Sequence, residues 1–316
     1  MSRWQDSTQL LAHGVRRRVF EHTLKNNGGY LSQALSAAEL FAMLYGRVLK
    51  LGPSEAPLEP RAFTGVPGPG VDYVTGGAYN GPHSPELDRF IFSPAHYALV
   101  LYATLIEVGR LAESGLDHFN EDGSTVEMIG AEHSPGVETT TGSLAQALSQ
   151  AGGMALARKR RGDTGDVWVM MSDGEFQEGQ TWEAVEALAR FGLDNVRVVV
   201  DVNGQQCDGL LQPVATQASL AARLEAFGAS AVQVDGHDLD ALDEAMTRRT
   251  GRPHVVVAMT NPVQGLPLFA ERAPNLHYLR FSSADERARY EAAYAEVAPL
   301  RSGARADVAA AEGMVR

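Results

Sequence analysis

The sequence predicts an α/β fold in which a doubly wound, mostly parallel sheet is flanked by helices. Short, nearly continuous apolar runs have the length and composition of strands that are buried on both faces. These runs are residues 167–171, 196–202, 230–234 and 255–259. Parallel strands need crossover connections, and helical stretches separate the runs. These stretches are residues 181–191, 219–227 and 239–249.

The N-terminal part of the chain is expected to be helical. Residues 8–25 place apolar side chains four apart, which is typical of an amphipathic helix, and the helix is expected to begin near Asp6. Ser36 and Glu39 have the spacing of a capping box in front of an apolar run, which predicts a second helix over residues 37–50. Further helices are expected at residues 93–110, 143–161 and 285–297.

Residues 52–85 are rich in proline and glycine, with seven of each in this segment, about three times ordinary usage. Such a composition predicts a long irregular loop, which is either a surface excursion or a wall of an active site. We expect residues 1–280 to form one domain that includes this loop. Residues 281–316 are expected to form a C-terminal helix followed by a frayed tail.

The charge balance argues against nucleic acid as a partner. The chain has 27 Lys and Arg against 39 Asp and Glu, a formal net charge of −12, which is the wrong sign for neutralising phosphates or binding an anionic membrane. Its single cysteine, Cys207, cannot form an internal disulfide, and the first residues contain no apolar signal segment. No apolar run approaches the length of a membrane-spanning helix. We therefore expect a cytoplasmic protein.

Oxygen-bearing side chains follow two neighbouring strands of the predicted sheet. Asp173 and Gly174 come directly after the first strand, and Asn203 follows the second. Ligands of open parallel sheets lie beyond the carboxyl ends of the strands, so Asp173 and Asn203 are expected to lie side by side. A carboxylate, an amide oxygen and a backbone carbonyl suit Mg²⁺ that also binds phosphate oxygens. The Gly174 turn into the next helix adds N–H groups for a phosphate.

Motifs around these residues resemble the thiamine-diphosphate motif of the transketolase family. Residues 173–184 read Asp-Gly-Glu-x-x-Glu-Gly-x-x-Trp-Glu-Ala, residues 193–195 read Leu-Asp-Asn, and residues 200–209 read Val-Asp-x-Asn-Gly-x-Gln-x-Asp-Gly. Residues 88–96 are similar to the family's R-D-R-F-x-L-S-x-G-H segment, and residues 135–144 are similar to its P-G-V-E-x-T-T-G-x-L segment. The resemblance implies the diphosphate-binding domain of the family.

The resemblance also implies a cofactor site made of residues at matching positions. Mg²⁺ would be bound by the side chains of Asp173 and Asn203 and by the carbonyl of Gln205. Thiamine diphosphate would be bound by residues at the same edge and on the neighbouring loops. These residues are His96, Gly142, Leu144, Asp173, Gly174, Glu175, Asn203, Gln205 and His277. Of these, Gly142 and Leu144 would line the aminopyrimidine.

Four residues are catalytic candidates, and one is a candidate for substrate binding. The resemblance places His96 and His277 near the diphosphate and the reacting centre and Glu178 at a subunit interface. His96 is also expected near a helix N-terminus, where an anion is favoured. His133 lies close to a family histidine position but out of register, and Asn26 replaces a family histidine that handles substrate hydroxyls.

The activity that the resemblance implies is transfer of a two-carbon ketol unit through a thiamine-diphosphate carbanion. The chain is too short to contain the family's pyrimidine-binding domain, so we expect that domain on a second chain, in a heterotetramer with two copies of each. Because Asn26 cannot titrate near neutral pH, 2-oxo acid decarboxylation or dehydrogenation stays open as an alternative. A non-catalytic subunit that pairs with an active homologue is the other alternative.

Overall fold

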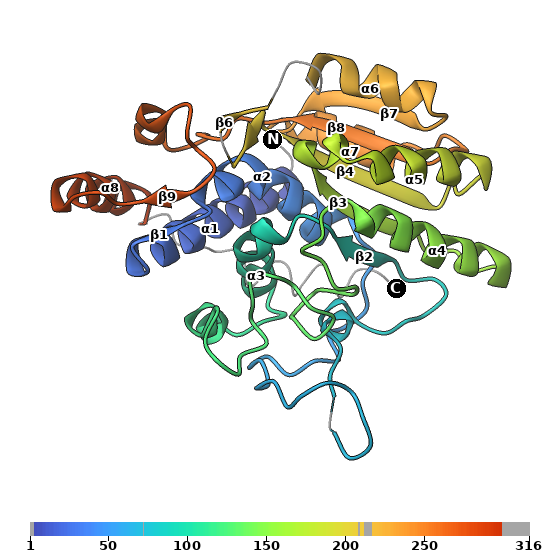
Figure 1. Cartoon of the computed structure of the whole chain (residues 1–316), viewed down its shortest axis with the longest axis horizontal. Coiled ribbons are helices and arrows are strands. Elements are labelled where there is room, and N and C mark those ends of the chain that lie inside the picture. The colour runs from blue at the N-terminus through green and yellow to red at the C-terminus, as the bar shows by residue number, and fades with distance from the viewer. Residues whose placement is uncertain (1–2, 72, 208, 212–216, 299–316) are drawn as a thin grey trace.

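A five-stranded parallel sheet forms the centre of the protein within the residues that the computed structural model describes, which are 3–71, 73–207, 209–211 and 217–298. The strand order is β2-β3-β4-β8-β7, and every neighbouring pair is parallel (Figure 1). The strands are β2 (Arg89–Phe92), β3 (Val167–Ser172), β4 (Val196–Val202), β7 (Ser230–Asp235) and β8 (His254–Met259). The predicted fold class is therefore confirmed.

The strand that the sequence did not reveal is β2. It has four residues, all of them buried, so it shows no alternation of apolar and polar side chains. Its first residue is an arginine, which a buried strand seldom contains. The structure explains this residue, because the Arg89 guanidinium forms an ion pair with the buried Glu138 carboxylate at 2.7 Å. The charge is paired inside the protein.

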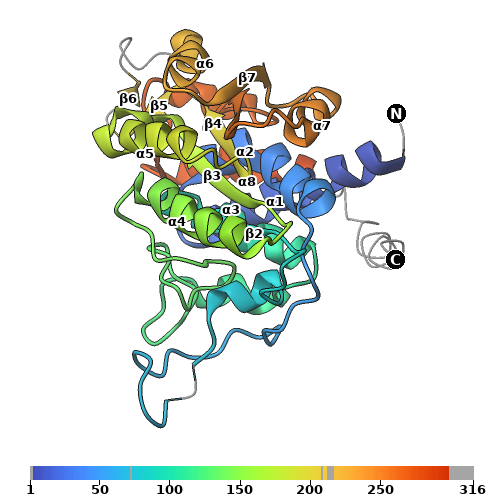
Figure 2. The ribbon, with the colours of Figure 1, turned by 90° about the vertical axis from the view of Figure 1, so that its right-hand side faces the viewer.

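Helices cover both faces of the sheet (Figures 1 and 2). One core cluster includes residues of α1 (Arg3–Lys25), α2 (Leu31–Met43), α3 (Ala98–Glu107), α7 (Leu239–Thr247) and α8 (Ala284–Val297). The opposite cluster includes residues of α4 (Gln146–Arg161), α5 (Gly179–Arg190) and α6 (Gln217–Ala226). Side chains alternate along the strands, so that Phe90 and Phe92 join the first cluster and Ile91 joins the second. This is the doubly wound arrangement.

Several helix boundaries differ from the predictions. The first helix begins at Arg3 rather than near Asp6, and α2 begins at Leu31 rather than at residue 37. The predicted cap at Ser36 is wrong, because this residue lies inside a helix whose residues are all buried. Its hydroxyl donates to the Asp201 carboxylate at 2.6 Å instead of capping the helix. A π-helix follows α2 over Leu44–Val48.

Two other helices begin later than expected, since short turns precede them. A 3-10 helix over Ala95–Tyr97 leads into α3, and α4 begins at Gln146. The C-terminal helix is predicted to within a residue, and it begins with the Ser283 hydroxyl accepting the Glu286 N–H. The expected frayed tail, residues 301–316, lies outside the described residues. No helix in the described part of the chain is long and apolar enough to cross a membrane.

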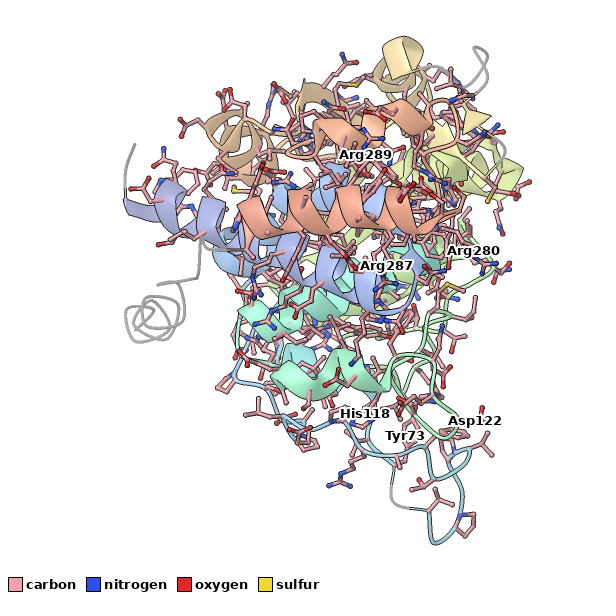
Figure 3. The ribbon with its side chains drawn as sticks, turned by 90° about the vertical axis from the view of Figure 1, so that its left-hand side faces the viewer. Tyr73, His118, Asp122, Arg280, Arg287 and Arg289 are labelled. Atoms are coloured by element: carbon pink, nitrogen blue, oxygen red, sulfur yellow. The ribbon has the colours of Figure 1, made fainter. Side chains whose placement is uncertain are left out.

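Residues 52–85 form the predicted irregular segment, apart from residue 72, which is not described, and a 3-10 helix over Gly76–Asn80. The segment extends away from the sheet towards the end of the molecule where Tyr73, His118 and Asp122 are labelled (Figure 3). The Arg110 guanidinium donates to the Tyr79 carbonyl and the Gly52 carbonyl, each at 2.9 Å. These bonds hold the beginning of the segment and a residue near its end against the residues that follow α3.

Two small antiparallel ribbons complete the fold. One pairs β1 (Gly28–Gly29) with β9 (Leu279–Arg280), and the other pairs β5 (Gln205–Gln206) with β6 (Gly209–Leu210). The first brings the turn after α1 beside residues close to His277. The second begins directly after the carboxyl end of β4. Both ribbons therefore adjoin segments in which the sequence predicts site residues.

Candidate cofactor site

Asp173 and Asn203 lie at the carboxyl ends of adjacent strands, as predicted. The β3–β4 register pairs Ser172 with Asp201, which places Asp173 next to the end of β4. The Asp173 carboxylate accepts the Gly204 N–H at 2.8 Å. The loops that follow the two strands are therefore joined by a direct hydrogen bond.

The Asn203 amide has a fixed orientation. Its Nδ2 donates to the Tyr97 hydroxyl and to the Asp201 carboxylate, each at 3.0 Å. Its Oδ1 accepts the Gln205 N–H at 2.9 Å. Because all the bonds to hydroxyl and carboxylate groups go to the nitrogen, the amide oxygen is left on the side of the 204–205 loop.

Asp201 holds this arrangement from inside the protein. The carboxylate is fully buried and accepts hydrogen bonds from the hydroxyls of Ser36 and Tyr97, each at 2.6 Å, and from the Thr260 hydroxyl. Burial raises the pKa of Asp201, and these donors act in the opposite direction. One carboxylate thus connects α2, the turn before α3, and the residue after β8 to the Asn203 amide. We call these residues, Ser36, Tyr97, Asp201, Asn203 and Thr260, the Asp201 network.

The oxygens at this edge fit a divalent cation. Asp173 is 2% exposed, and burial raises its pKa to about 7, although the Gly204 N–H acts to lower it. In the described part of the chain no group of three His, Cys, Asp or Glu side chains could hold a metal ion. A cation here would therefore depend on one carboxylate with amide and carbonyl oxygens, a set of hard ligands that suits Mg²⁺. It would also compensate for the desolvation of Asp173.

The buried carboxylate of Glu175 connects three segments around the site by hydrogen bonds. One carboxylate oxygen accepts the Ala145 N–H at 2.8 Å and the Ser93 hydroxyl. The other accepts the Ser172 N–H at 2.7 Å. Ala145 has a left-handed backbone, with φ of 70°, which costs about 1–2 kcal/mol for a residue with a Cβ. The bond to Glu175 stabilises this turn, which places Leu144 and the start of α4 beside the site.

Gly142 and Gly174, the two glycines predicted at the site, differ in whether the packing of the chain requires a glycine. Gly142 has a φ of +123°, and a Cβ there would lie 2.7 Å from the Ile129 side chain, so the chain itself requires glycine. Gly174 has no left-handed φ, and a Cβ there would meet nothing within 4 Å. The packing of this chain therefore does not explain Gly174. A ligand approaching the backbone of the 3-10 helix Asp173–Gln177, which follows β3, would explain it.

His96 and His277 are brought together from distant parts of the chain. Their ring centroids are 5.1 Å apart, and the Tyr30 ring lies 6.0 Å from His96 and 5.6 Å from His277. Burial, together with the neighbouring His277, lowers the pKa of His96 to about 3, and burial also lowers the pKa of His277. Both imidazoles are therefore neutral near pH 7. The pair adjoins the Asp201 network, because Tyr97 directly follows His96.

The other candidates lie apart from this pair. His133 contacts Phe63, with ring centroids 4.6 Å apart, and its Nε2 is 3.2 Å from the Glu127 carboxylate. Glu178 is exposed directly before α5. The Asn26 amide donates to the His22 carbonyl at 2.9 Å, which folds it back on the end of α1. Their predicted roles stay predictions.

Sequence reasoning missed most of the Asp201 network. Asp201 was visible as an acidic residue at the end of an apolar strand, which is a signal for a buried functional carboxylate. Tyr97 follows the predicted site residue His96, but this position alone does not mark a tyrosine as functional. Nothing in the local sequence marks Thr260. These residues meet only through tertiary packing.

The fold and this edge define an α/β protein that binds its ligand beyond the carboxyl ends of a parallel sheet. Comparison with known proteins gives a more specific class. The family model for the transketolase thiamine diphosphate binding domain matches residues 77–275. The chain belongs to the transketolase family, which confirms the resemblance seen in the sequence.

Relatives of similar length carry informative names. An uncharacterized transketolase family protein of Sinorhizobium fredii is 35% identical, with 84% of this chain and 88% of that protein covered. An apulose-4-phosphate transketolase subunit of Actinobacillus succinogenes is 29% identical, over 86% of this chain and 91% of that protein. The 6-deoxy-6-sulfo-D-fructose transketolase subunit SqwG of a Clostridium species is 30% identical, over 82% and 86%. The prediction of a transketolase-like subunit is thus confirmed.

Solved transketolases share the fold. The Campylobacter jejuni enzyme superposes with a TM-score of 0.65 and 21% identity, covering 92% of this chain and 48% of that one. The Leishmania mexicana enzyme gives 0.64 and 21%, with 95% and 45% covered. The chain therefore spans about half the length of the solved transketolases that it matches.

Proposed function

We propose that this chain is the cofactor-binding subunit of a heteromeric transketolase that moves a two-carbon ketol unit between sugar-like substrates. The observation that carries the proposal is the edge where Asp173 and Asn203 adjoin the His96–His277 pair. The names of the relatives, two of which are subunits of sugar transketolases, support it.

In this proposal Mg²⁺ is held by the side chains of Asp173 and Asn203 and by the Gln205 carbonyl. The fixed orientation of the Asn203 amide supports this assignment, since its oxygen lies beside the Gln205 N–H. Gly174 lies against the diphosphate of thiamine diphosphate, for which the open space at its Cβ position is the support. Gly142 and Leu144 line the aminopyrimidine. Glu175 contributes by holding the turn that precedes α4.

The histidines act as neutral hydrogen-bonding groups. When bound, thiamine diphosphate would supply an acidic carbon that is a nucleophile towards a ketose carbonyl once it is deprotonated, and a ring that can delocalise the negative charge of the adduct. The Gln33 amide donates to the His277 carbonyl at 3.2 Å and lies 3.4 Å from His277 Nδ1. The Ser32 hydroxyl donates to the Gln33 Oε1 at 3.0 Å, which supports this amide orientation. With Nδ1 accepting, the proton of His277 sits on Nε2, where it can donate to a substrate oxygen.

The pyrimidine-binding half of the enzyme is proposed to be a second chain, assembled with this one as a heterotetramer with two copies of each. The support is that this chain covers 91% and 86% of two relatives that are named as transketolase subunits. Glu178, exposed beside the cofactor edge, would face that chain. The cytoplasmic location expected from the sequence stays a prediction.

The test identifies what binds to the wild-type chain and compares it with a variant that should lose metal binding. The tagged chain is purified from its own organism, and bound protein and cofactor are measured together by native mass spectrometry. We expect a transketolase-type second chain, thiamine diphosphate and Mg²⁺, and activity with ketose phosphates. Asp173→Ala should weaken Mg²⁺-dependent cofactor binding at least 100-fold, whereas Asp122→Ala, at an exposed site far from the sheet edge, should leave it unchanged.

Other outcomes would replace this function. Turnover of 2-oxo acids in place of ketose phosphates would indicate the decarboxylase or dehydrogenase alternative. An Asp173→Ala complex with full activity would indicate a non-catalytic subunit. A chain that is recovered alone and binds no added cofactor with Mg²⁺ would contradict the proposal altogether.

A further inference from the structure

Three rings with unused hydrogen-bonding groups meet beside the cofactor edge. They are Tyr30, His96 and His277, and each is partly exposed. No hydrogen bond joins the His96 imidazole or the Tyr30 hydroxyl to any residue in the described part of the chain. His277 contacts the Gln33 amide through Nδ1 and its backbone carbonyl, which leaves Nε2 unused. Polar groups that are largely buried usually have partners, so unused groups that converge in one place indicate a binding site.

A short ribbon brings Tyr30 to this cluster. Tyr30 directly follows β1, in which Gly29 pairs with Leu279 of β9. The two residues before β9 are His277 and Tyr278, so the ribbon places Tyr30 beside both. The Tyr30 ring packs edge-on against Tyr278, with centroids 4.9 Å apart, and edge-on against His277 at 5.6 Å. These contacts fix the ring, although its hydroxyl has no hydrogen-bond partner among the described residues.

The Tyr30 hydroxyl keeps its proton near pH 7. Burial raises the pKa of Tyr30, and the neighbouring Cys207 and Tyr278 act in the same direction. Cys207 comes two residues after Gln205, whose carbonyl is a predicted Mg²⁺ ligand. The Tyr30 ring is therefore close both to the histidine pair and to the ribbon that follows β4. A protonated phenol at this place can donate and accept a hydrogen bond.

Asn26, the residue that the sequence predicts for substrate binding, does not belong to this cluster. Its side chain is exposed, and its amide donates to the His22 carbonyl on the end of α1 at 2.9 Å. Among the described residues Asn26 makes no hydrogen bond to either histidine of the pair. Within residues 26–30 it is Tyr30 that contacts His96 and His277.

The two oxygens of a ketol unit differ in their hydrogen bonding. The carbonyl oxygen only accepts, whereas the neighbouring hydroxyl donates and accepts. With Nδ1 accepting from Gln33, the Nε2 of His277 is a donor and fits the carbonyl oxygen. The Tyr30 hydroxyl donates and accepts, so it fits the substrate hydroxyl. With ring centroids 5.6 Å apart, the two side chains can contact one small ligand together.

We propose that Tyr30 binds the hydroxyl of the transferred ketol unit, in the role that the sequence predicts for Asn26. This inference rests on the proposed function, and it names the residue that distinguishes a ketol unit from a unit without the hydroxyl. A site that hydrogen-bonds a substrate hydroxyl discriminates against a compound that lacks it, because the polar group of the site is then left without a partner. Tyr30 is thus a specificity-determining residue.

The first test removes single polar groups from the chain in its complex with the second subunit. The substrate is the ketose phosphate that the wild-type complex turns over fastest. Tyr30→Phe keeps the ring contacts and removes the hydroxyl. We expect the KM for the ketose to rise about tenfold, the effect of one lost hydrogen bond. The kcat should change less than about twofold, because the bond is present in the ground state and the transition state alike.

Two further variants separate Tyr30 from its neighbours. Tyr278→Phe is the matched control, since it removes the hydroxyl of the other tyrosine at this ribbon, which is 41% exposed. Among the ring contacts of the described residues, Tyr278 contacts Tyr30 but neither histidine. Asn26→Ala tests the residue that the sequence predicts. Both variants should change the KM less than about twofold.

The second test removes the hydroxyl from the substrate. For an analogue of the ketose without the hydroxyl of its ketol unit, the wild-type complex should have a KM about tenfold higher. The Tyr30→Phe complex should have the same KM for both compounds, whereas a general distortion of the site would weaken both to the same extent. Calorimetry of ketose binding to the complex without cofactor should show the same tenfold loss in Tyr30→Phe. The Tm and the Mg²⁺-dependent binding of the cofactor should be unchanged.

The outcomes distinguish this inference from the proposed function. An unchanged KM in Tyr30→Phe, or a loss that is equal for the ketose and its analogue, would overturn the inference and leave the proposed function intact. A tenfold loss in Asn26→Ala with none in Tyr30→Phe would return the role to Asn26. Weaker cofactor binding in Tyr30→Phe would also overturn the inference. If the wild-type complex turns over no ketose phosphate, both proposals fail together.

Discussion

Two surface helices, α8 and α4, belong to the core clusters on opposite sides of the sheet and expose different kinds of side chain. On α8 the exposed arginines are paired, Arg287 with Glu291 at 2.8 Å and Arg289 with Glu271 at 2.7 Å (Figure 3). On α4 the exposed residues before residue 158 carry no charge. Both helices have a buried inner side, so they differ only in the side chains on their exposed sides. The comparison shows that α8 exposes charged side chains along its length, whereas α4 exposes charge only in its last turn.

The largest effect is expected on the inner side of α8. Tyr290 is 2% exposed, and its ring lies 5.2 Å from Phe281 and 6.3 Å from Phe20. Tyr290→Ala should lower the free energy of unfolding by about 4 kcal/mol, since it removes a buried aromatic side chain and leaves a cavity. Urea unfolding of the isolated chain measures this. A loss below about 1 kcal/mol would mean that α8 is not part of the core.

The layer beneath α8 also contains a group that is sensitive to acid. His22 on α1 packs edge-on against Phe119, with ring centroids 5.1 Å apart. Burial, aided by Lys25 and opposed by Asp117, lowers the pKa of His22 to about 4. The unfolded chain, with a pKa near 6.5, binds the proton first, so stability should fall as the pH drops from 7 towards 4.

Between pH 7 and pH 5 this one histidine should cost about 2 kcal/mol of unfolding free energy. His22→Phe, which keeps a ring against Phe119, should remove that part of the pH dependence. Urea unfolding of both proteins at the two pH values measures the difference. Equal pH dependence in the variant and the wild type would show that His22 is not the responsible group.

The smallest effect is expected on the outer side of α8. Arg289 and Glu271 are more than half exposed, and exposed ion pairs contribute little. Arg289→Ala should change the Tm by less than about 1 °C and leave assembly unchanged. A clear loss of assembly would show that α8 contacts a partner.

The sequence alone was sufficient where a local pattern and the physical cause coincide. The apolar strands predicted the sheet, and the order of its strands placed Asp173 beside Asn203. Prediction from the sequence failed where the interaction partner that determines a residue's role is distant in the chain. Ser36 has the pattern of a helix cap, but the Asp201 carboxylate, 165 residues away, makes it a buried hydrogen-bond donor inside α2. The short strand β2 was missed because Arg89 is paired with Glu138 from a later loop.

The Asp201 network has a consequence for how the protein is made. Its residues range from Ser36 to Thr260 in the sequence, so the network forms only after most of the described chain has folded. During synthesis from the N-terminus, Asp173 and Asn203 both emerge before Thr260 does. A nascent chain therefore holds the predicted metal ligands before it can orient the Asn203 amide. Tight capture of a cofactor would then report that the chain has folded at least through the end of β8.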